Sequence, residues 1–169
     1  MASHGAWHQA FIALGANLGD AQQALQDAAE AIGLIPSTHI VAGSSLYVTA
    51  PVDSSGPDYV NAVMQVNTKL HPVELLVALQ SIEQAAGRER PYRNAPRTLD
   101  LDVLLYDDAV FESTLLTIPH PRMWQRAFVL VPLAEIAPDK VTASQLQAVT
   151  DQAITRLDKP LLACASHCR

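Results

Sequence analysis

Asp100 and Asp102 are the two residues whose type and spacing most directly indicate chemistry. They alternate with apolar residues, and this period of two predicts a strand over Thr98–Tyr106. Both carboxylates then lie on one face of the strand, with their Cα atoms about 7 Å apart. Carboxylates this close repel each other unless a cation lies between them, and Mg²⁺ favours carboxylate and phosphate oxygens as ligands. The residues expected on the opposite, core-facing side are Leu99, Leu101, Val103 and Leu105.

Arginines are concentrated directly before this aspartate pair. No Lys or Arg precedes Lys69, and half of the eight arginines then fall within ten residues, at Arg88, Arg90, Arg93 and Arg97. A guanidinium donates two parallel hydrogen bonds to a phosphate, and arginines together with a metal form a recurrent clamp for a polyphosphate. The combination predicts a magnesium-dependent phosphate site. The alternatives are a solvated loop for the arginines and an edge strand with a charged outer face for the aspartates.

His120 is a second candidate phosphate contact. It lies in a proline-rich stretch just before Arg122 and Arg126. An imidazole can donate a hydrogen bond to a phosphate, although a single histidine is more often structural. The sequence has no G-x-x-x-x-G-K-[ST] motif, which excludes a P-loop kinase. The turn from Gly15 to Gly19 could approach a phosphate, but two glycines are more often only a turn.

The composition indicates one acidic globular domain. The chain has 169 residues, of which 49% are hydrophobic, and a net charge of −6. We therefore expect a buried core and no nucleic-acid or membrane partner. The longest uncharged run, residues 31–52, is interrupted by glycine and proline, which excludes a spanning helix, and the N-terminus lacks the basic residues of a secretory signal.

The two cysteines, Cys164 and Cys168, both lie in the last six residues and cannot staple a fold. This usage is typical of a reducing compartment, so we expect a cytoplasmic protein. Together with His167, the two thiols could ligate a metal, but a frayed terminus is the preferred interpretation.

The spacing of apolar residues predicts an α+β fold. Strands are expected over residues 9–15, 39–49, 59–68 and 98–106, with a short return strand near Val110-Phe111. Helices are expected from an N-cap at Asp20 to before Pro36, and over 72–86, 128–136 and, more weakly, 144–157. The order β-α-β-β-α-β is that of the ferredoxin-like arrangement, an antiparallel sheet with helices packed on it in a single domain.

Several of these segments together resemble one known family. The stretch Arg93-Asn-Ala-Pro-Arg97-Thr-Leu-Asp100-Leu-Asp102-Val-Leu is similar to the signature of the 6-hydroxymethyl-7,8-dihydropterin pyrophosphokinases of folate biosynthesis. Four further segments match in the same order, namely Leu14–Asp20, Ser45–Thr49, Tyr59–Asn61 and Thr117–Phe128. The resemblance covers about residues 9–138, and residues 139–169 are expected to form a helical extension.

The resemblance implies a ferredoxin-like fold and the transfer of pyrophosphate from ATP to the hydroxymethyl group of the pterin, with release of AMP. By the same resemblance, Asp100 and Asp102 hold two Mg²⁺ ions, and both act in catalysis together with Arg88 and Arg97. The implied contacts to ATP are Gln80, Glu83, Arg88, Arg97, Val103, Thr117, His120 and Arg126. The implied contacts to the pterin are Tyr59 and Phe128, which sandwich the ring, and Thr49, Val52 and Asn61, which bind its polar edge. The loops 52–58 and 87–97 would exclude water, and we expect a monomer.

The sequence departs from the better-known members at Asn94-Ala95, where many have Trp-Gly, and at Ala50 and Pro121. These differences concern closure of the arginine-rich loop more than the reaction. Two other functions remain open. A ligand-sensing domain could share the fold, but would not need both the carboxylates and the arginines. A magnesium-dependent phosphohydrolase could use the same aspartates, but would release inorganic phosphate and need no aromatic sandwich.

Overall fold

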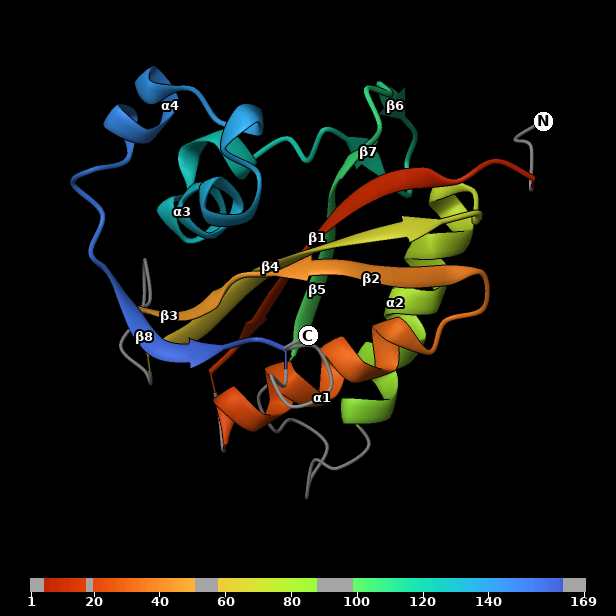
Figure 1. Ribbon diagram of the computed structural model, residues 1–169, viewed down its shortest axis with the longest axis horizontal. Coiled ribbons are helices and arrows are strands. Elements are labelled where there is room, and N and C mark those ends of the chain that lie inside the picture. Colours follow the sequence, from red (N-terminus) through yellow and green to blue (C-terminus); the bar gives the residue numbers. More distant parts are fainter. Residues whose placement is uncertain (1–4, 18–19, 51–57, 88–98, 163–169) are drawn as a thin grey trace.

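The computed structural model describes residues 5–17, 20–50, 58–87 and 99–162 (Figure 1). Seven elements form the first two thirds of the chain: β1 (His8–Ala16), α1 (Ala21–Gly33), β2 (Thr38–Gly43), β3 (Ser45–Thr49), β4 (Tyr59–Thr68), α2 (Pro72–Gly87) and β5 (Asp100–Tyr106). The remainder forms β6 (Phe111–Glu112), β7 (Thr117–Ile118), α3 (Ala127–Ile136), α4 (Ala143–Ala148) and β8 (Ile154–Pro160). Two short 3₁₀ turns flank α3, at Met123–Gln125 and Pro138–Lys140.

The main sheet has the strand order β5-β1-β4-β3-β8, and β2 also pairs with β4. All of its pairings are antiparallel. β4 is long enough to pair with β3 at one end and with β2 at the other. β2 and β3 together therefore take the place of one strand, and β1-α1-β2/β3-β4-α2-β5 is the predicted ferredoxin-like arrangement.

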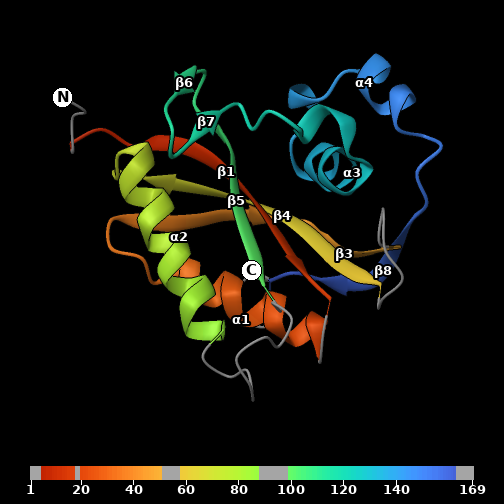
Figure 2. The same ribbon diagram turned by 180° about the vertical axis from the view of Figure 1, so that it is seen from behind.

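Helices cover the two faces of the sheet unequally. α1 and α2 lie side by side on one face, and α3 lies on the other (Figures 1 and 2). Asp20 caps α1 as predicted, because its side chain accepts a hydrogen bond from the backbone N–H of Gln23. The buried stripe of α1 is also the predicted one: Leu25, Ala28, Ala29 and Ile32. The longest described helix, α2, has 16 residues, and none of the described helices combines the length and apolar content needed to span a bilayer.

The strand predicted over residues 39–49 is divided at Ser44. This serine is fully buried, donates its backbone N–H to Val63 O, and accepts a hydrogen bond from Val63 N through its hydroxyl oxygen. The hydroxyl in turn donates to Ser45 O. The side chain thus replaces ladder hydrogen bonds at the point where the chain passes from β2 to β3.

The prediction that Leu105 shares a face with Leu99, Leu101 and Val103 is wrong. Val103 pairs with Ile12 and Leu105 pairs with Phe11, so Leu104 is an extra residue in the ladder. Leu104 lies on the α3 face by simple alternation with Asp100 and Asp102, and the bulge puts Leu105 on that face as well, where both pack in the cluster beneath α3. Asp100 and Asp102 precede the bulge, so the predicted alternation still places both of them on one face.

The helical extension predicted over residues 139–169 is wrong for residues 154–160. A capping box between Thr142 and Gln145 begins α4, but the helix ends at Ala148. Residues 154–160, part of them expected to be helical, instead form β8, which pairs with β3. β3 has a free edge without this strand, and pairing with it outweighs a weak helical pattern.

Candidate active site

Strand pairing places Asp100 in a row of residues that crosses the sheet. Asp100 pairs with Gly15, Gly15 pairs with Asn61, and Asn61 pairs with Tyr47. Directly paired residues share a face, so all four lie on the face that α3 covers in part. Asp102 lies in the next row, opposite Ala13, and both carboxylates are half-buried. The predicted placement of the aspartates on the face opposite Leu101 and Val103 is confirmed, since these two are buried beneath α1 and α2.

Asp102 lines a pocket with three other residues expected to bind the nucleotide, Val103, Thr117 and His120. The β6–β7 hairpin and its turn, residues 113–116, form one wall of this pocket, and Leu76 of α2 and Pro121 complete it. The sequence analysis did not find this wall. The available signal was a pair of leucines, Leu115 and Leu116, in a short polar turn.

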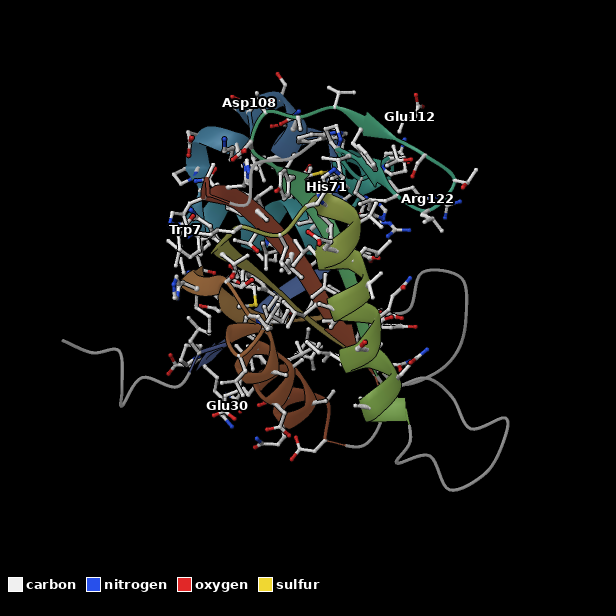
Figure 3. The ribbon with its side chains drawn as sticks, turned by 90° about the vertical axis from the view of Figure 1, so that its right-hand side faces the viewer. Trp7, Glu30, His71, Asp108, Glu112 and Arg122 are labelled. Atoms are coloured by element: carbon white, nitrogen blue, oxygen red, sulfur yellow. The ribbon has the colours of Figure 1, made fainter. Side chains whose placement is uncertain are left out.

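His120 is oriented by its own loop. Its backbone N–H donates to Leu104 O, and its Nδ1 accepts a hydrogen bond from the backbone N–H of Arg122 at 3.2 Å. Burial lowers the pKa of His120, and the charges of Arg126 and Arg122 act in the same direction, whereas Asp102 opposes them. The imidazole is therefore neutral near pH 7, and its proton lies on Nε2. Arg122 lies beyond the N-terminal end of α2, on the same side as Glu112 (Figure 3).

Glu83 of α2 holds the backbone of β5 between the two aspartates. Its carboxylate accepts a hydrogen bond from the N–H of Leu101 at 2.7 Å. β5 is the edge strand on this side of the sheet, so Glu83 satisfies a backbone donor that faces away from β1. Gln80, one helical turn earlier, is exposed.

The residues expected to contact the pterin gather at the other end of the same row. Thr49 and Asn61 are both buried, and the Thr49 hydroxyl donates to Asn61 Oδ1 at 2.8 Å. This bond turns Asn61 Nδ2 toward Gly15. Tyr59 pairs with Thr49 and is half-buried.

Phe128 comes to this face from α3, with the guanidinium carbon of Arg126 5.3 Å from its ring centroid. α3 packs mainly against β4 and β3, the strands that carry the other expected pterin contacts. The fold thus brings Thr49, Tyr59 and Asn61 together on the face that carries Asp100 and Asp102, and α3, which carries Phe128, packs on the same face.

Several expected site residues lie outside the described part of the chain. They are Val52, Arg88 and Arg97, together with Arg90, Arg93 and most of the loops 52–58 and 87–97. Gly19 and the Cys164, His167 and Cys168 tail also lie outside it.

Similarity to solved structures agrees with the class of fold. The Plasmodium falciparum HPPK-DHPS triple mutant has a TM-score of 0.66 at 14% identity, and the match covers 86% of this chain and 43% of that one. A structure of HPPK-DHPS in complex with substrates has the same TM-score, 0.66, at 13% identity. The chain spans less than half the length of these two-part proteins. At such identities the likeness establishes the fold alone, which is ferredoxin-like.

Similarity of sequence identifies the family. Residues 11–138 match the model of 7,8-dihydro-6-hydroxymethylpterin-pyrophosphokinase. The 2-amino-4-hydroxy-6-hydroxymethyldihydropteridine pyrophosphokinase of Haemophilus influenzae is 46% identical over 143 residues, which cover 84% of this chain and 89% of that protein. The enzyme of the same name from Bacillus subtilis is 40% identical over 151 residues, which cover 89% of this chain and 90% of that protein. The chain belongs to the 7,8-dihydro-6-hydroxymethylpterin-pyrophosphokinase family, and the resemblance expected from its motifs is confirmed.

Proposed function

We propose that the protein transfers pyrophosphate from ATP to the hydroxymethyl group of 6-hydroxymethyl-7,8-dihydropterin, a step of folate biosynthesis. The hydroxyl oxygen forms a bond to the β-phosphorus, the bond from that phosphorus to the oxygen of the α-phosphate breaks, and AMP leaves. The observation that carries the proposal is the row Asp100-Gly15-Asn61 across three strands. In this row only a glycine separates Asp100, proposed here to bind the metal, from Asn61, proposed here to contact the pterin, which supports a site for both substrates on one face.

Asp100 and Asp102 are proposed to hold magnesium, with two ions expected. Two carboxylates on one face of one strand suit Mg²⁺, which takes oxygen ligands and usually keeps substrate phosphates and water among them. Within the described residues, no group of three or more His, Cys, Asp or Glu side chains forms a complete metal site, so further ligands would come from substrate and water. When bound, the metal would neutralise charge on the phosphates.

The protein's own groups would position the phosphates. The Nε2–H of neutral His120 can donate a hydrogen bond to a phosphate oxygen, and His120 lines the same pocket as Asp102. Arg126, Arg88 and Arg97 are proposed to neutralise further charge, and Gln80, Glu83, Thr117 and the backbone near Val103 to contact the nucleotide. Catalysis then depends on in-line orientation and charge stabilisation.

The pterin is proposed to stack between Tyr59 and Phe128. Its polar edge would meet Asn61 and the backbone around Thr49 and Val52. Asn61 suits this role because Thr49 already occupies its Oδ1, which fixes the direction of the Nδ2 donor. A buried polar edge needs such fixed partners, since an unpaired donor or acceptor would cost binding energy.

Product analysis tests the reaction. The protein is mixed with Mg-ATP and 6-hydroxymethyl-7,8-dihydropterin, and AMP, ADP and phosphate are resolved by chromatography. We expect AMP that depends on the pterin, with no ADP. Phosphate release without the pterin would instead indicate a hydrolase, and no turnover by folded protein would contradict the proposed enzyme.

The protein is also proposed to be a cytoplasmic monomer without nucleic-acid or membrane partners. Light scattering after gel filtration tests the monomer, because a dimer would give twice the mass of one chain, which is 18.2 kDa.

A further inference from the structure

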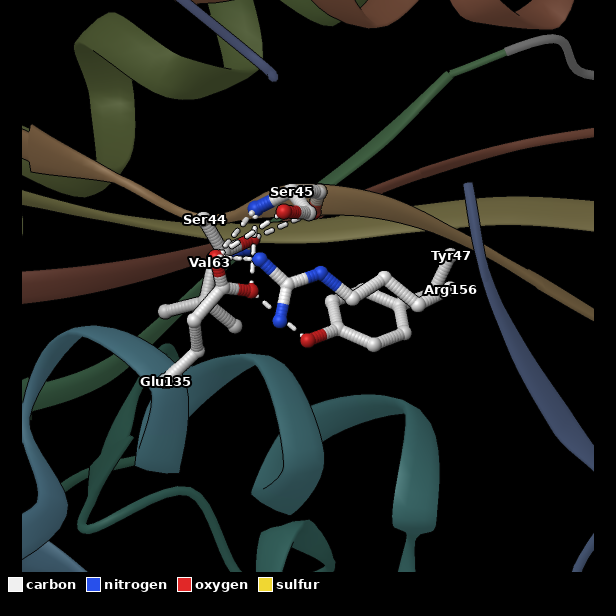
Figure 4. Close-up of polar contacts among 6 residues, drawn as sticks. All are labelled: Ser44, Ser45, Tyr47, Val63, Glu135 and Arg156. Carbon is white, nitrogen blue, oxygen red and sulfur yellow. Dashed lines mark hydrogen bonds and ion pairs between the residues drawn. The ribbon is translucent and has the colours of Figure 1, made fainter. Parts of the chain in front are cut away.

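Glu135 of α3 is the centre of a polar cluster with Ser45, Tyr47 and Arg156 (Figure 4). Its carboxylate accepts hydrogen bonds from the Ser45 N–H at 3.0 and 3.1 Å and from the Ser45 hydroxyl at 2.9 Å. The Tyr47 hydroxyl donates to it at 2.6 Å, and Arg156 pairs with it at 3.3 Å. One side chain therefore connects α3 to both β3 and β8.

This cluster joins α3 to β3, two of the elements that carry the residues proposed to contact the pterin. Glu135 follows Phe128 by seven residues, which is about two helical turns, so the two side chains lie on one face of α3. Ser45, Tyr47 and Thr49 alternate along one face of β3. Glu135 therefore lies on the same face of α3 as Phe128, and its partners Ser45 and Tyr47 lie on the same face of β3 as Thr49.

The rest of the contact between α3 and the sheet is apolar. Val129, Leu130 and Leu133 pack into the core cluster on this face, and apolar packing has no strong directional preference. Pro132 lies inside α3 and cannot donate the helical hydrogen bond to the Phe128 carbonyl. Directional bonds at Glu135 are therefore what sets the position of the helix along and above β3.

We propose that Glu135 is a positioning residue for the pterin: it holds α3 at the height above β3 and β4 at which one flat ring fits beneath Phe128. This inference rests on the proposed function. A ring stacked on an aromatic side chain needs close contact, since a gap of about 0.5–1 Å already forfeits a quarter to a half of the dispersion energy of each atom pair. A small displacement of α3 would therefore weaken pterin binding more than phosphate binding, because Asp100 and Asp102 lie on β5 and only Arg126, at the N-cap of α3, would move with the helix.

The charge of Glu135 agrees with this role. Burial alone would raise the pKa of Glu135, but the hydrogen bonds from Tyr47 and Ser45 and the charge of Arg156 outweigh it and lower the pKa below 4.5. The carboxylate is ionised at neutral pH, and every contact made to it comes from a donor. Replacing it by the amide of glutamine would keep the shape but turn an NH₂ group toward those donors.

The test compares steady-state kinetics of Glu135→Gln with those of the wild type. We expect the KM for the pterin to rise about ten- to a hundredfold, as for a misplaced substrate-positioning group, while the KM for ATP rises several times less, since Arg126 is the one proposed ATP contact at the end of α3. Glu30→Gln is the matched control. Glu30 is exposed on α1, on the far side of the sheet from α3, and its variant should behave as wild type (Figure 3).

Tyr47→Phe is a second, milder variant, which removes one hydroxyl and keeps the ring. We expect a rise of about three- to tenfold in the pterin KM, the size of one net hydrogen bond. Combined with Glu135→Gln it should add little, because both changes break the same contact.

A pterin KM that stays at the wild-type value in both variants would overturn the proposal, as would equal increases in the KM for pterin and for ATP. Should Glu135→Gln not fold, Tyr47→Phe alone decides by the same criteria. Failure of the proposed function would be seen in the wild-type protein itself, which would make no pterin-dependent AMP. Both proposals would then be withdrawn before any variant is compared.

Discussion

The two faces of the sheet use the same strands for different purposes. Beneath α1 and α2, a continuous apolar cluster joins the sheet to both helices, with members such as Leu14, Leu25, Met64, Leu79 and Leu101. Beneath α3, a smaller cluster leaves room on the same face for Asp100, Asp102, Thr49 and Asn61. One face is closed and gives stability, and the other is partly covered and offers polar groups to a substrate.

β5 and β4 show how one strand serves both faces. In β5, Leu101 is buried beneath α2 while Asp100 and Asp102 point to the other side. In β4, Ala62 and Met64 join the closed core while Asn61 and Val63 face α3. The period of two lets each strand be anchored by its apolar residues, so polar residues one position away can be exposed without loss of the fold. Substitutions on the two faces should therefore separate stability from activity.

The largest expected effect is on the open face, at Asp100→Ala and Asp102→Ala. Loss of a metal ligand should reduce the rate of AMP formation by about 10³-fold or more, because a bound metal contributes several kcal/mol to stabilising the reacting phosphates. The melting temperature should stay near that of the wild type, since neither side chain is in the core. Asp108→Ala, an exposed aspartate in the turn after β5, is the control. Near-normal turnover of either site variant would remove the metal assignment.

On the closed face, Leu79→Ala should lower stability and leave substrate binding unchanged. Leu79 is fully buried in the cluster beneath the sheet, and its truncation should cost about 2–5 kcal/mol of unfolding free energy. Urea denaturation measures the loss. At a temperature where the variant is folded, both KM values should remain those of the wild type, and a selective change in one of them would mean that the two faces are not independent.

Phe128→Ala should weaken the pterin site most, with a smaller effect on ATP through Arg126, whose guanidinium lies over the Phe128 ring. Loss of one stacking partner should raise the pterin KM by about tenfold, from the aromatic contact and the apolar area together. The KM for ATP should rise several times less than the KM for the pterin. Phe128→Tyr keeps the ring and should restore most of the affinity; if it does not, Phe128 does not act by stacking.

Gly15→Ala should have a smaller effect of the same kind. An added Cβ would lie 3.0 Å from Asn61 Nδ2, so the amide must shift and the hydrogen bond geometry to the pterin changes. We expect an increase of about threefold in the pterin KM. Gly33→Ala is the comparison on the closed side, where the Cβ would meet Ile40 Cδ1 at 2.7 Å. That variant should change stability and leave the pterin KM unaltered.

The smallest expected effect concerns pH. The pKa of Glu135 is lower in the folded protein than its usual 4.5, so the folded state favours the carboxylate. The stability that this group contributes is present above pH 4.5 and is lost as the pH falls toward its folded-state pKa. Glu135→Gln should therefore lose less stability than the wild type on acidification below pH 4.5, as measured by thermal melts. If the wild type and Glu135→Gln lose the same stability below pH 4.5, other carboxylates determine the loss of stability at acidic pH.

Local patterns in the sequence were enough to predict most of the elements. β4 was predicted with its observed limits, Tyr59–Thr68, because its apolar residues follow the period of a strand. The cap at Asp20 and the buried stripe of α1 were predicted from a helical period and one side-chain hydrogen bond. The aspartate pair was assigned to the correct face for the same reason. In each case the information lies within a few neighbouring residues.

The same local patterns could not predict pairing between distant segments. β8 was mistaken for helix because its strand character comes from pairing with β3, more than a hundred residues earlier. The bulge at Leu104 depends on the register of β5 against β1. Glu135 meets Ser45 across 90 residues, and no feature of its neighbourhood in the sequence indicates that contact.

The sequence by itself therefore determined most of the elements, their order and the family, and it supplied the candidate site residues as predictions, since periodicity and short motifs are local. Only the tertiary structure decided that Asp100, Gly15 and Asn61 form one row, that residues 113–117 wall the pocket beside Asp102, and that Glu135 ties α3 to β3. Strand register and helix docking are set by packing among segments far apart in the chain, and the energy of that packing is not readable from any one of them.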